Sequence, residues 1–224
     1  MNQRERRIYL INALMEELPE YKAIRIPDDD RGQQRLLRTL FNVRPPFPAS
    51  AEFLEIQDAY LSERIRERGI TDVSQLKASK TNDRVYLWQG DITTLMCDAI
   101  VNAANSALLG CFQPCHSCID NIVHSLSGVQ LRIKCNEIME AQGHDETTGQ
   151  LKLHRDTISP VNMYCILSAQ LYLGNCKTKI VSCWQTAIAL VWSWPLQMRF
   201  SPLPSAAFQR EYSIFRRIRQ RKLP

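Results

Sequence analysis

The stretch GCFQPCHSCIDNIVH concentrates three cysteines and two histidines in a short segment. Within it, Cys111, His116 and Cys118 have the spacing C-x4-H-x-C. Thiolate and imidazole are preferred zinc ligands, and three protein ligands leave a fourth position open for water or substrate. A structural zinc needs four ligands, and either Cys115 or His124 could supply the fourth. The spacing alone does not separate a metal site from a reduced, partly buried cysteine loop.

Two other segments place polar side chains at the ends of expected strands. In QGDITTL, Asp91 comes just after a strand, where α/β folds bind ligands, and its carboxylate could accept hydrogen bonds from an adenine amino group or a ribose hydroxyl. An N-cap role for Asp91 explains the same pattern. Asn102 and Asn105 follow the next strand, and they could orient a polar ligand or satisfy the backbone of a turn.

The elements that must position these residues alternate between strand and helix patterns. RVYLWQGDITTLMCDAIVNAANSAL predicts a strand, a turn at Gly90, a short helical turn and a second strand at Ala99–Asn102. SCIDNIVHSLSGVQLRIKCNEIMEAQG has apolar residues at helical spacing and predicts one or two helices. Strands that alternate with helices indicate an α/β layer fold.

Residues 1–80 are predicted to form a helical lobe. Apolar positions recur at helical spacing over residues 4–18, and a second helix follows the acidic residues of DDDRGQQRLLRTLFNV. The prolines of RPPFPAS end it, and a third helix runs from a cap at Ser50 to Gly69. Since helix periodicity reports burial and not function, we expect the lobe to be a packing or partner-docking extension without chemistry.

The net charge of +5 is divided unevenly along the chain. Residues 1–150 carry 17 Lys and Arg against 21 Asp and Glu, whereas residues 151–224 carry 11 against 2. So abrupt a change indicates two pieces of different origin. The basic end RRIRQRK lacks the interleaved aromatic residues and the fold motif of a nucleic-acid patch, so we expect no nucleic-acid partner.

Composition and hydropathy predict a globular protein in a reducing compartment. The chain is 45% hydrophobic and 23% charged, as globular proteins are. No run reaches the ~18 consecutive apolar residues of a membrane span, and MNQRERRIYLINALMEELPEY lacks the apolar core and cleavage site of a signal peptide. We therefore expect a cytoplasmic protein without a membrane partner, whose eight cysteines are thiols or metal ligands rather than disulfides.

Together, QGDIT, DAIVNAANSALLG and GCFQPCHSCIDNIVH resemble the macrodomain family, which binds ADP-ribose. The third motif is similar to that of zinc-dependent bacterial macrodomains, which are protein-ADP-ribosyl hydrolases found with a sirtuin-like ADP-ribosyltransferase and lipoyl-carrier proteins. FNVRPPFP and FLEIQDAYLSERI are similar to that family's N-terminal extension. The resemblance implies a three-layer α/β/α macrodomain sandwich behind an N-terminal helical lobe. It divides the chain into a helical extension (1–80), the first part of a macrodomain with its zinc loop (81–150) and a segment outside the pattern (151–224).

The resemblance also implies the residues that bind ADP-ribose. Asp91 and Ile92 would hold the adenine end, and Asn105 would orient the distal ribose. Ile119 and Asp120 would line the nucleotide site by backbone and side chain. Asn105 and Asp120 are the residues that this resemblance assigns to catalysis.

For the metal, the resemblance assigns Cys111, His116 and Cys118 as ligands of a catalytic Zn²⁺ ion and leaves Cys115 without a role. Zinc can polarise a ribose hydroxyl or lower the pKa of a bound water towards ~7 beside the bond that is cut. The implied function is zinc-dependent removal of ADP-ribose from ADP-ribosylated protein side chains, with a lipoyl-carrier protein as a possible substrate. Two alternatives stay open: an ADP-ribose-binding module without turnover, and a non-functional remnant of the hydrolase.

The family pattern stops after Gln150. The family continues with a strand of the form YNLPxKYVxHTVGP and an ISTGVF loop, in which backbone amides bind the diphosphate. Here the only glycine beyond residue 150 is Gly174. When the third base of each codon is joined to the first two of the next, the sequence from Leu153 can encode TPGYNLPCKYVLHTVGP, and that from Ala207 can encode ISTGVF. We therefore expect residues 151–224 to be translated out of frame and to leave the fold incomplete or disordered there.

Overall fold

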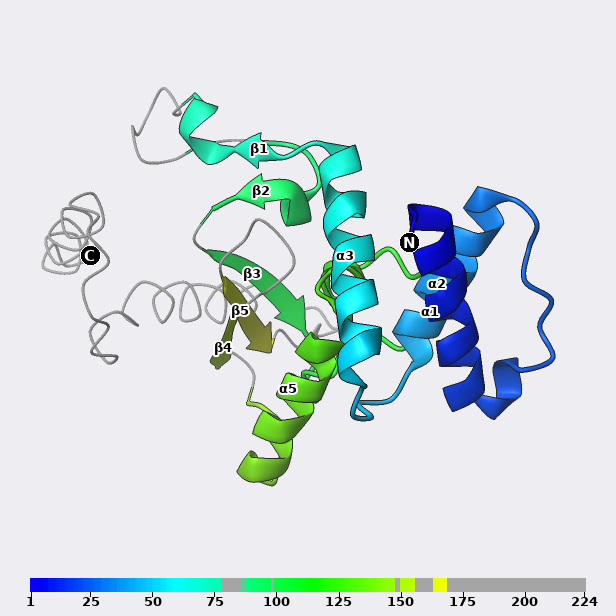
Figure 1. The fold of residues 1–224 in the computed structure, drawn as a ribbon. Helices are drawn as coiled ribbons and strands as arrows, with labels where there is room; N and C mark the ends of the chain where they lie inside the picture. The colour runs from blue at the N-terminus through cyan, green and yellow to red at the C-terminus, as the bar shows by residue number, and fades with distance from the viewer. Residues whose placement is uncertain (78–85, 87, 98, 148–149, 156–162, 169–224) are drawn as a thin grey trace, which may run out of the picture. The chain divides into compact units, whose positions relative to one another are not determined.

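The computed structural model describes a large part of the chain, and Figure 1 draws the rest as a thin grey trace. The contacts divide the chain into two units, Met1–Gly174 and Asn175–Pro224, and the second lies wholly outside the described residues. The described structure is therefore that of the first unit. The described residues are 1–77, 86, 88–97, 99–147, 150–155 and 163–168.

Three helices form the N-terminal lobe (Figure 1): α1 (Gln3–Glu17), α2 (Asp30–Val43) and α3 (Ala51–Arg68). Each begins after a polar residue whose side chain accepts a hydrogen bond from a backbone N–H of the first turn. The first N–H groups of a helix have no acceptor within the helix, so the capping side chain supplies one. A short 3₁₀ turn, η1 (Pro19–Tyr21), follows α1. The capping residues are Asn2, Asp29 and Ser50. The predicted three-helix lobe is confirmed.

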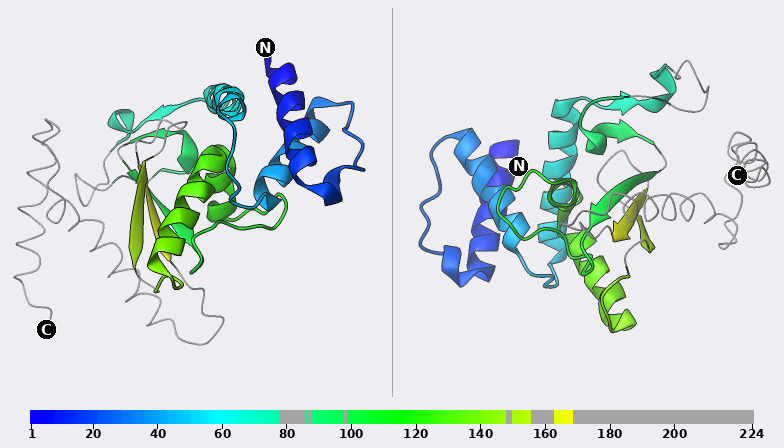
Figure 2. Two further views of the ribbon diagram at one scale, coloured as in Figure 1. Left: turned by 60° about the horizontal axis from the view of Figure 1, so that its bottom comes forward. Right: turned by 180° about the vertical axis from the view of Figure 1, so that it is seen from behind.

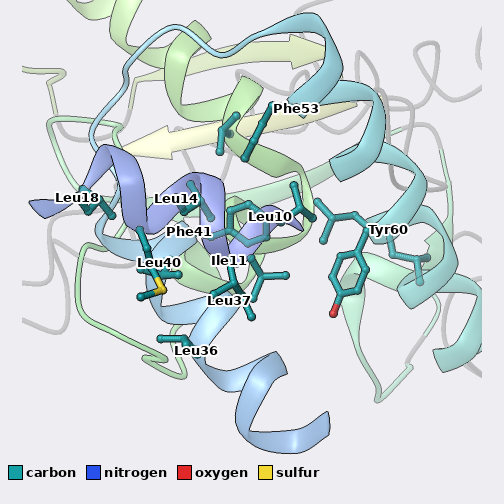
Figure 3. Close-up of a cluster of buried hydrophobic side chains, with 14 residues drawn as sticks. Leu10, Ile11, Leu14, Leu18, Leu36, Leu37, Leu40, Phe41, Phe53 and Tyr60 are labelled. Carbon is teal, nitrogen blue, oxygen red and sulfur yellow. The ribbon is translucent and has the colours of Figure 1, made fainter. Parts of the chain in front are cut away.

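A single apolar cluster holds the lobe together (Figure 3). Leu10 and Leu14 of α1 meet Leu40 of α2 there, and all three are fully buried. Burying a leucine side chain contributes ~1.5–3 kcal/mol, so this cluster is a main source of the lobe's stability. Val129 belongs to the same cluster although it comes from α5. The lobe is therefore packed onto the following part of the chain.

Two short strands follow the lobe. β1 (Thr71–Asp72) pairs in parallel with β2 (Leu95–Met96). The 3₁₀ turn η2 (Val73–Gln75) comes after β1, and η3 (Ile92–Thr94) comes before β2. The helical turn predicted after Gly90 is thus confirmed, whereas most of the strand predicted before it lies outside the described residues.

Two helices follow the cysteine-rich loop, α4 (Ile119–Leu126) and α5 (Gly128–Gln142). Ser127 separates them, and α5 begins at Gly128, whose φ of +70° is in the left-handed region that favours glycine. A Cβ at this position would lie 2.4 Å from Nε2 of Gln57 on α3, so a larger residue would displace that side chain. The predicted helical stretch is therefore two helices.

The main sheet has the strand order β3-β5-β4. β3 (Ala99–Ala104) pairs in parallel with β5 (Met163–Ser168), and β4 (Leu151–Arg155) pairs with β5 in antiparallel orientation. β3 matches the predicted strand and runs two residues further. β4 and β5 fall in the segment expected to be out of frame, and the sequence pattern did not predict these two strands.

The arrangement confirms the predicted α/β fold with an N-terminal helical lobe. In all views of Figures 1 and 2, α3 lies between the α1–α2 pair and β3. Val123 of α4 and Leu131 of α5 share a second apolar cluster with Ile100 and Ala104 of β3, which places these helices against the strand. The remainder of the predicted three-layer sandwich lies outside the described residues. Within the described residues, no helix has the length and apolar character that a membrane crossing requires.

Candidate metal centre and nucleotide-binding residues

The loop between β3 and α4 brings Cys111, His116 and Cys118 together. Their ligand atoms all lie within 4.8 Å of one another, and each side chain is partly buried. Sγ of Cys111 is 3.6 Å from Nδ1 of His116. The three residues predicted as metal ligands therefore form one cluster in the folded chain.

The geometry and chemistry of this cluster fit zinc. Zn–S and Zn–N bonds of ~2.3 and ~2.0–2.1 Å at a tetrahedral angle place sulfur and nitrogen about 3.6 Å apart, which is the separation seen here. Burial, and after it the neighbouring thiol of Cys111, raises the pKa of Cys118 above its ordinary value. A cation between the two sulfurs would reverse that effect, because metals bind cysteine as thiolate.

Neither candidate for a fourth ligand belongs to the cluster. Sγ of Cys115 lies 3.4 Å from Oγ1 of Thr39 and 3.5 Å from the carbonyl oxygen of Arg35, so this thiol faces α2. His124 is buried in the interior, with Nε2 3.6 Å from Oδ1 of Asp120. Among the described residues, the cluster therefore supplies three ligands, which is the arrangement of a catalytic zinc with an open position.

Asn121 holds the loop from the first turn of α4. It is fully buried, and its side-chain amide donates to the carbonyl oxygens of Cys111 (3.1 Å) and Gln113 (2.9 Å). Its backbone N–H donates to Sγ of Cys118, which caps the helix at 3.4 Å. One residue thus fixes both ends of the segment that carries the three ligands.

The helical lobe holds the other side of the loop. Nη2 of Arg38 donates to the carbonyl oxygen of His116 (2.7 Å) and to Oδ1 of Asn121 (2.9 Å). Asn42 is fully buried, and its Oδ1 accepts the backbone N–H of Cys115 at 2.8 Å. Cys115 has a φ of +52°, so this bond holds a backbone conformation that a cysteine rarely adopts. Through Arg38 and Asn42 the lobe takes part in building the metal loop, which the sequence analysis did not foresee.

Asp91 lies at the N-cap of η3. Its Oδ1 accepts the backbone N–H (3.0 Å) and the hydroxyl (2.6 Å) of Thr93, and its Oδ2 pairs with Arg68 at 3.0 Å. The N-cap interpretation is therefore confirmed, and adenine binding by Asp91 stays a prediction. Ile92 and Ile119 are both partly buried, and each packs against the apolar cluster that contains Ile100 of β3.

Asn105 is exposed directly after β3 and closes the turn that follows. Its Oδ1 accepts the backbone N–H of Ala107 at 3.1 Å, and its Nδ2 is 3.3 Å from the carbonyl oxygen of Gly110. The interpretation that this asparagine satisfies a turn is confirmed. The predicted contact of Asn105 with the distal ribose stays a prediction.

Asp120 lies in a buried polar network under the loop. It is only 4% exposed, and its Oδ1 accepts Nδ2 of Asn102 at 2.8 Å. Burial raises the pKa of Asp120 to about 6, while the Asn102 hydrogen bond and the positive charge of Arg132 oppose the shift. The Asp120 carboxylate thus ties β3 to the first turn of α4, the same turn that carries Asn121. Its predicted catalytic role is not tested by these contacts.

Comparison with known proteins identifies close relatives. The protein-ADP-ribose hydrolase of Treponema medium is 56% identical over 155 residues, which cover 68% of this chain and 59% of that protein. The protein-ADP-ribose hydrolase of Staphylococcus aureus strain MRSA252 is 48% identical over 147 residues, which cover 66% of this chain and 54% of that protein. The chain therefore spans little more than half the length of these relatives.

The macrodomain of Trypanosoma brucei in complex with ADP-ribose is 20% identical, with a TM-score of 0.46 over 71% of this chain and 67% of that chain. No protein-family model matches the chain.

Proposed function

We propose that this chain belongs to the zinc-dependent protein-ADP-ribose hydrolases, which as macrodomains would remove ADP-ribose from modified protein side chains. The observation that carries the proposal is the cluster of Cys111, His116 and Cys118, whose spacing and separation suit a zinc ion with one open position. The identity of 56% to a protein-ADP-ribose hydrolase supports the same activity. We place the protein in the cytoplasm, where reducing conditions keep such thiols available to a metal.

A bound zinc ion would supply Lewis-acid chemistry, by polarising a ribose hydroxyl or lowering the pKa of a water. The chain's own residues would bind and orient the substrate. Asn105 is exposed beside the loop and would orient the distal ribose. The carboxylate of Asp91 would accept a hydrogen bond from the adenine amino group. A carboxylate offers about four acceptor positions, so some remain free beside the bonds to Thr93 and Arg68.

Two more residues complete the proposed site. Ile119 opens α4 beside the metal ligand Cys118, and its backbone would line the nucleotide pocket. Asp120 lies buried beneath the loop, where its hydrogen bond from Asn102 would hold the first turn of α4 in place beside the nucleotide. Modified lipoyl-carrier protein is the substrate that we propose from the family resemblance.

The activity is tested with zinc-loaded chain and a protein carrying labelled ADP-ribose. We expect release of ADP-ribose that a chelator abolishes and added zinc restores. Release that is unchanged after complete metal removal would exclude the zinc mechanism. Binding of ADP-ribose without any release would instead favour a module that only binds the nucleotide.

We propose further that residues 151–224 are translated out of frame. The support is the jump in charge at this point, the absence of a phosphate-loop glycine and the two family segments that reappear in one shifted frame. The stretch aligned with the Treponema medium protein covers 68% of this chain, so about a third of the chain lies outside it. Sequencing the coding DNA across codons 145–157 tests this: a missing or extra base supports the proposal, and a confirmed reading frame overturns it.

The missing glycine loop also favours a second candidate, a remnant of the hydrolase that still binds the metal and no longer binds the nucleotide. Beyond residue 150 the chain has only Gly174, so a backbone nest for a diphosphate has no glycine in the expected place. A chain that binds zinc and shows no binding of ADP-ribose would identify the remnant. Turnover by the same preparation would rule it out.

A further inference from the structure

A groove of about 440 Å³ lies between α2, α3 and α4, and its lining is strongly basic. Leu37, Phe41, Leu61 and Leu126 give it an apolar part. Among the described residues that line it there is no aspartate or glutamate. Its five arginines are Arg31, Arg35, Arg38, Arg64 and Arg68.

Three of these arginines have no ionic partner in the part of the chain that the structure describes. Arg64 pairs with Glu67, and Arg68 pairs with Asp91. Within the described part of the chain, no carboxylate lies at ion-pair distance from the other three, and Nε of Arg38 is buried without a hydrogen-bond acceptor. The three unpaired arginines are Arg31, Arg35 and Arg38.

The unpaired arginines stand on one face of α2, at positions i, i+4 and i+7. Like charges at this spacing repel one another and weaken a helix. The arrangement therefore costs stability unless an anion lies between the guanidinium groups. A carboxylate suits such a place, because the planar guanidinium fork can bind it through two parallel hydrogen bonds.

The groove adjoins the metal loop and is separate from the predicted nucleotide site. Cys115 lines the groove and directly precedes the metal ligand His116. Arg38 also lines it and donates to the carbonyl oxygen of that histidine at 2.7 Å. None of the residues predicted to bind zinc or ADP-ribose lines the groove. A chain held there would thus lie next to the metal loop without occupying the nucleotide position.

We propose that this groove binds an acidic peptide segment of the modified protein whose ADP-ribose is removed, an inference that rests on the proposed function. The arginines pair with the carboxylates of the segment, and the leucines and Phe41 receive its apolar side chains. A nucleic acid fits less well. It would extend beyond the groove over residues 1–150, whose excess of Asp and Glu repels a polyanion, and it would make no use of the apolar part.

The test uses the full chain and a fluorescein-labelled peptide of alternating glutamate and leucine, with binding followed by anisotropy. The variant Arg31→Gln/Arg35→Gln removes two exposed groove charges. The matched control Arg4→Gln/Arg66→Gln removes two exposed charges that do not line the groove. We expect at least a tenfold loss of affinity in the groove variant, less than a twofold change in the control, and no binding of the same peptide with glutamine in place of glutamate.

Other results would overturn the inference. Equal losses in both double variants would mean general charge attraction, and undiminished binding in both would locate the peptide elsewhere, such as on residues 216–222. Displacement by free ADP-ribose would make the groove the nucleotide site, and stronger binding of a single-stranded oligonucleotide would make it a nucleic-acid site. Zinc content and ADP-ribose release are measured on the same preparations. Their failure counts against the proposed function and leaves the peptide result to stand or fall separately.

Discussion

The metal loop and the predicted nucleotide residues are neighbours, yet they have different kinds of support. The metal loop is held from two sides, by Asn121 on the adjoining helix α4 and by Arg38 and Asn42 on α2, which is distant in sequence. Among the described residues, the side chain of Asn105, in contrast, bonds within its own turn, and Asp91 and Asp120 each bond to one side chain further away, Arg68 and Asn102. The diphosphate loop that the family pattern demands has no counterpart in this sequence.

The difference means that metal binding and nucleotide binding are separable in this chain. Within the described residues, the contacts that hold the metal loop come from before the β4–β5 pair, and the helical lobe that supplies Arg38 and Asn42 has its own apolar core. The nucleotide needs a phosphate site in addition. We therefore expect zinc binding to be robust and ADP-ribose binding to be weak in the same molecule.

The largest effect is expected for Cys118→Ala, which removes one of the three metal ligands. Two ligands cannot hold zinc firmly, so the purified variant should contain no zinc by elemental analysis. Cys115→Ala is the matched control, because its thiol faces Thr39 and not the cluster. If Cys115→Ala also loses its zinc, the three-ligand site is wrong and Cys115 is the fourth ligand.

The second effect concerns the nucleotide and the reading frame. Returning residues from 151 onward to the shifted frame should restore the glycine-containing phosphate loop. Two backbone hydrogen bonds to a charged phosphate contribute about 1.5–3 kcal/mol each, so affinity for ADP-ribose should rise at least about a hundredfold. Calorimetry with both proteins measures this, and tight binding by the chain as written would contradict the expectation.

The third effect tests the link between lobe and loop. Asn42→Ala leaves the partly buried backbone N–H of Cys115 without its acceptor, and loss of such a supporting bond should weaken zinc binding about 10–100-fold. Stability should also fall by about 1–3 kcal/mol. Competition with a chelating dye reports the zinc affinity.

A matched control for that change lies in the same lobe. Gln33 is buried, and its side chain accepts hydrogen bonds from Arg7 at 3.0 and 3.1 Å. These hydrogen bonds do not involve the metal loop. Gln33→Ala should lower stability to a similar degree and leave zinc affinity unchanged. Equal zinc affinities in the Asn42 and Gln33 variants would show that the lobe does not hold the loop.

The smallest effect is expected for Ser50→Ala, which removes the N-cap of α3. The hydroxyl accepts the backbone N–H of Phe53 at 3.1 Å, and loss of such a cap costs ~1 kcal/mol. Denaturant unfolding should show this loss, while zinc affinity stays the same. A change in zinc affinity would mean that α3 contributes to the metal loop in a way its contacts do not indicate.

Much of the helical lobe could be predicted because its signals are local. Caps such as Ser50, apolar spacing such as that of Leu36, Leu37 and Leu40, and the terminating Gly69 all act within one helix. The metal ligands were found for a related reason, since Cys111, His116 and Cys118 lie close together in sequence and only need a loop to converge.

The rest depends on contacts that join distant segments. β5 forms a strand by pairing with β3, which lies some sixty residues earlier in the sequence. A short apolar run such as β5 does not show which segment it will pair with. Arg38 and Asn42 stand four residues apart on α2, which puts them on one face, but nothing local says that this face meets the cysteine loop. The signal available in the sequence was Asn42, a polar residue close to the leucines of α2, and the structure shows that it is fully buried.

The zinc content of the purified full-length chain tests the central claim most directly. Elemental analysis after gel filtration gives the number of zinc ions per chain. A metal loop that is complete within the described residues predicts one zinc ion per chain, even if ADP-ribose does not bind. A zinc content no higher than that of Cys118→Ala would contradict the account, and the cysteine cluster would then be only a reduced, partly buried loop.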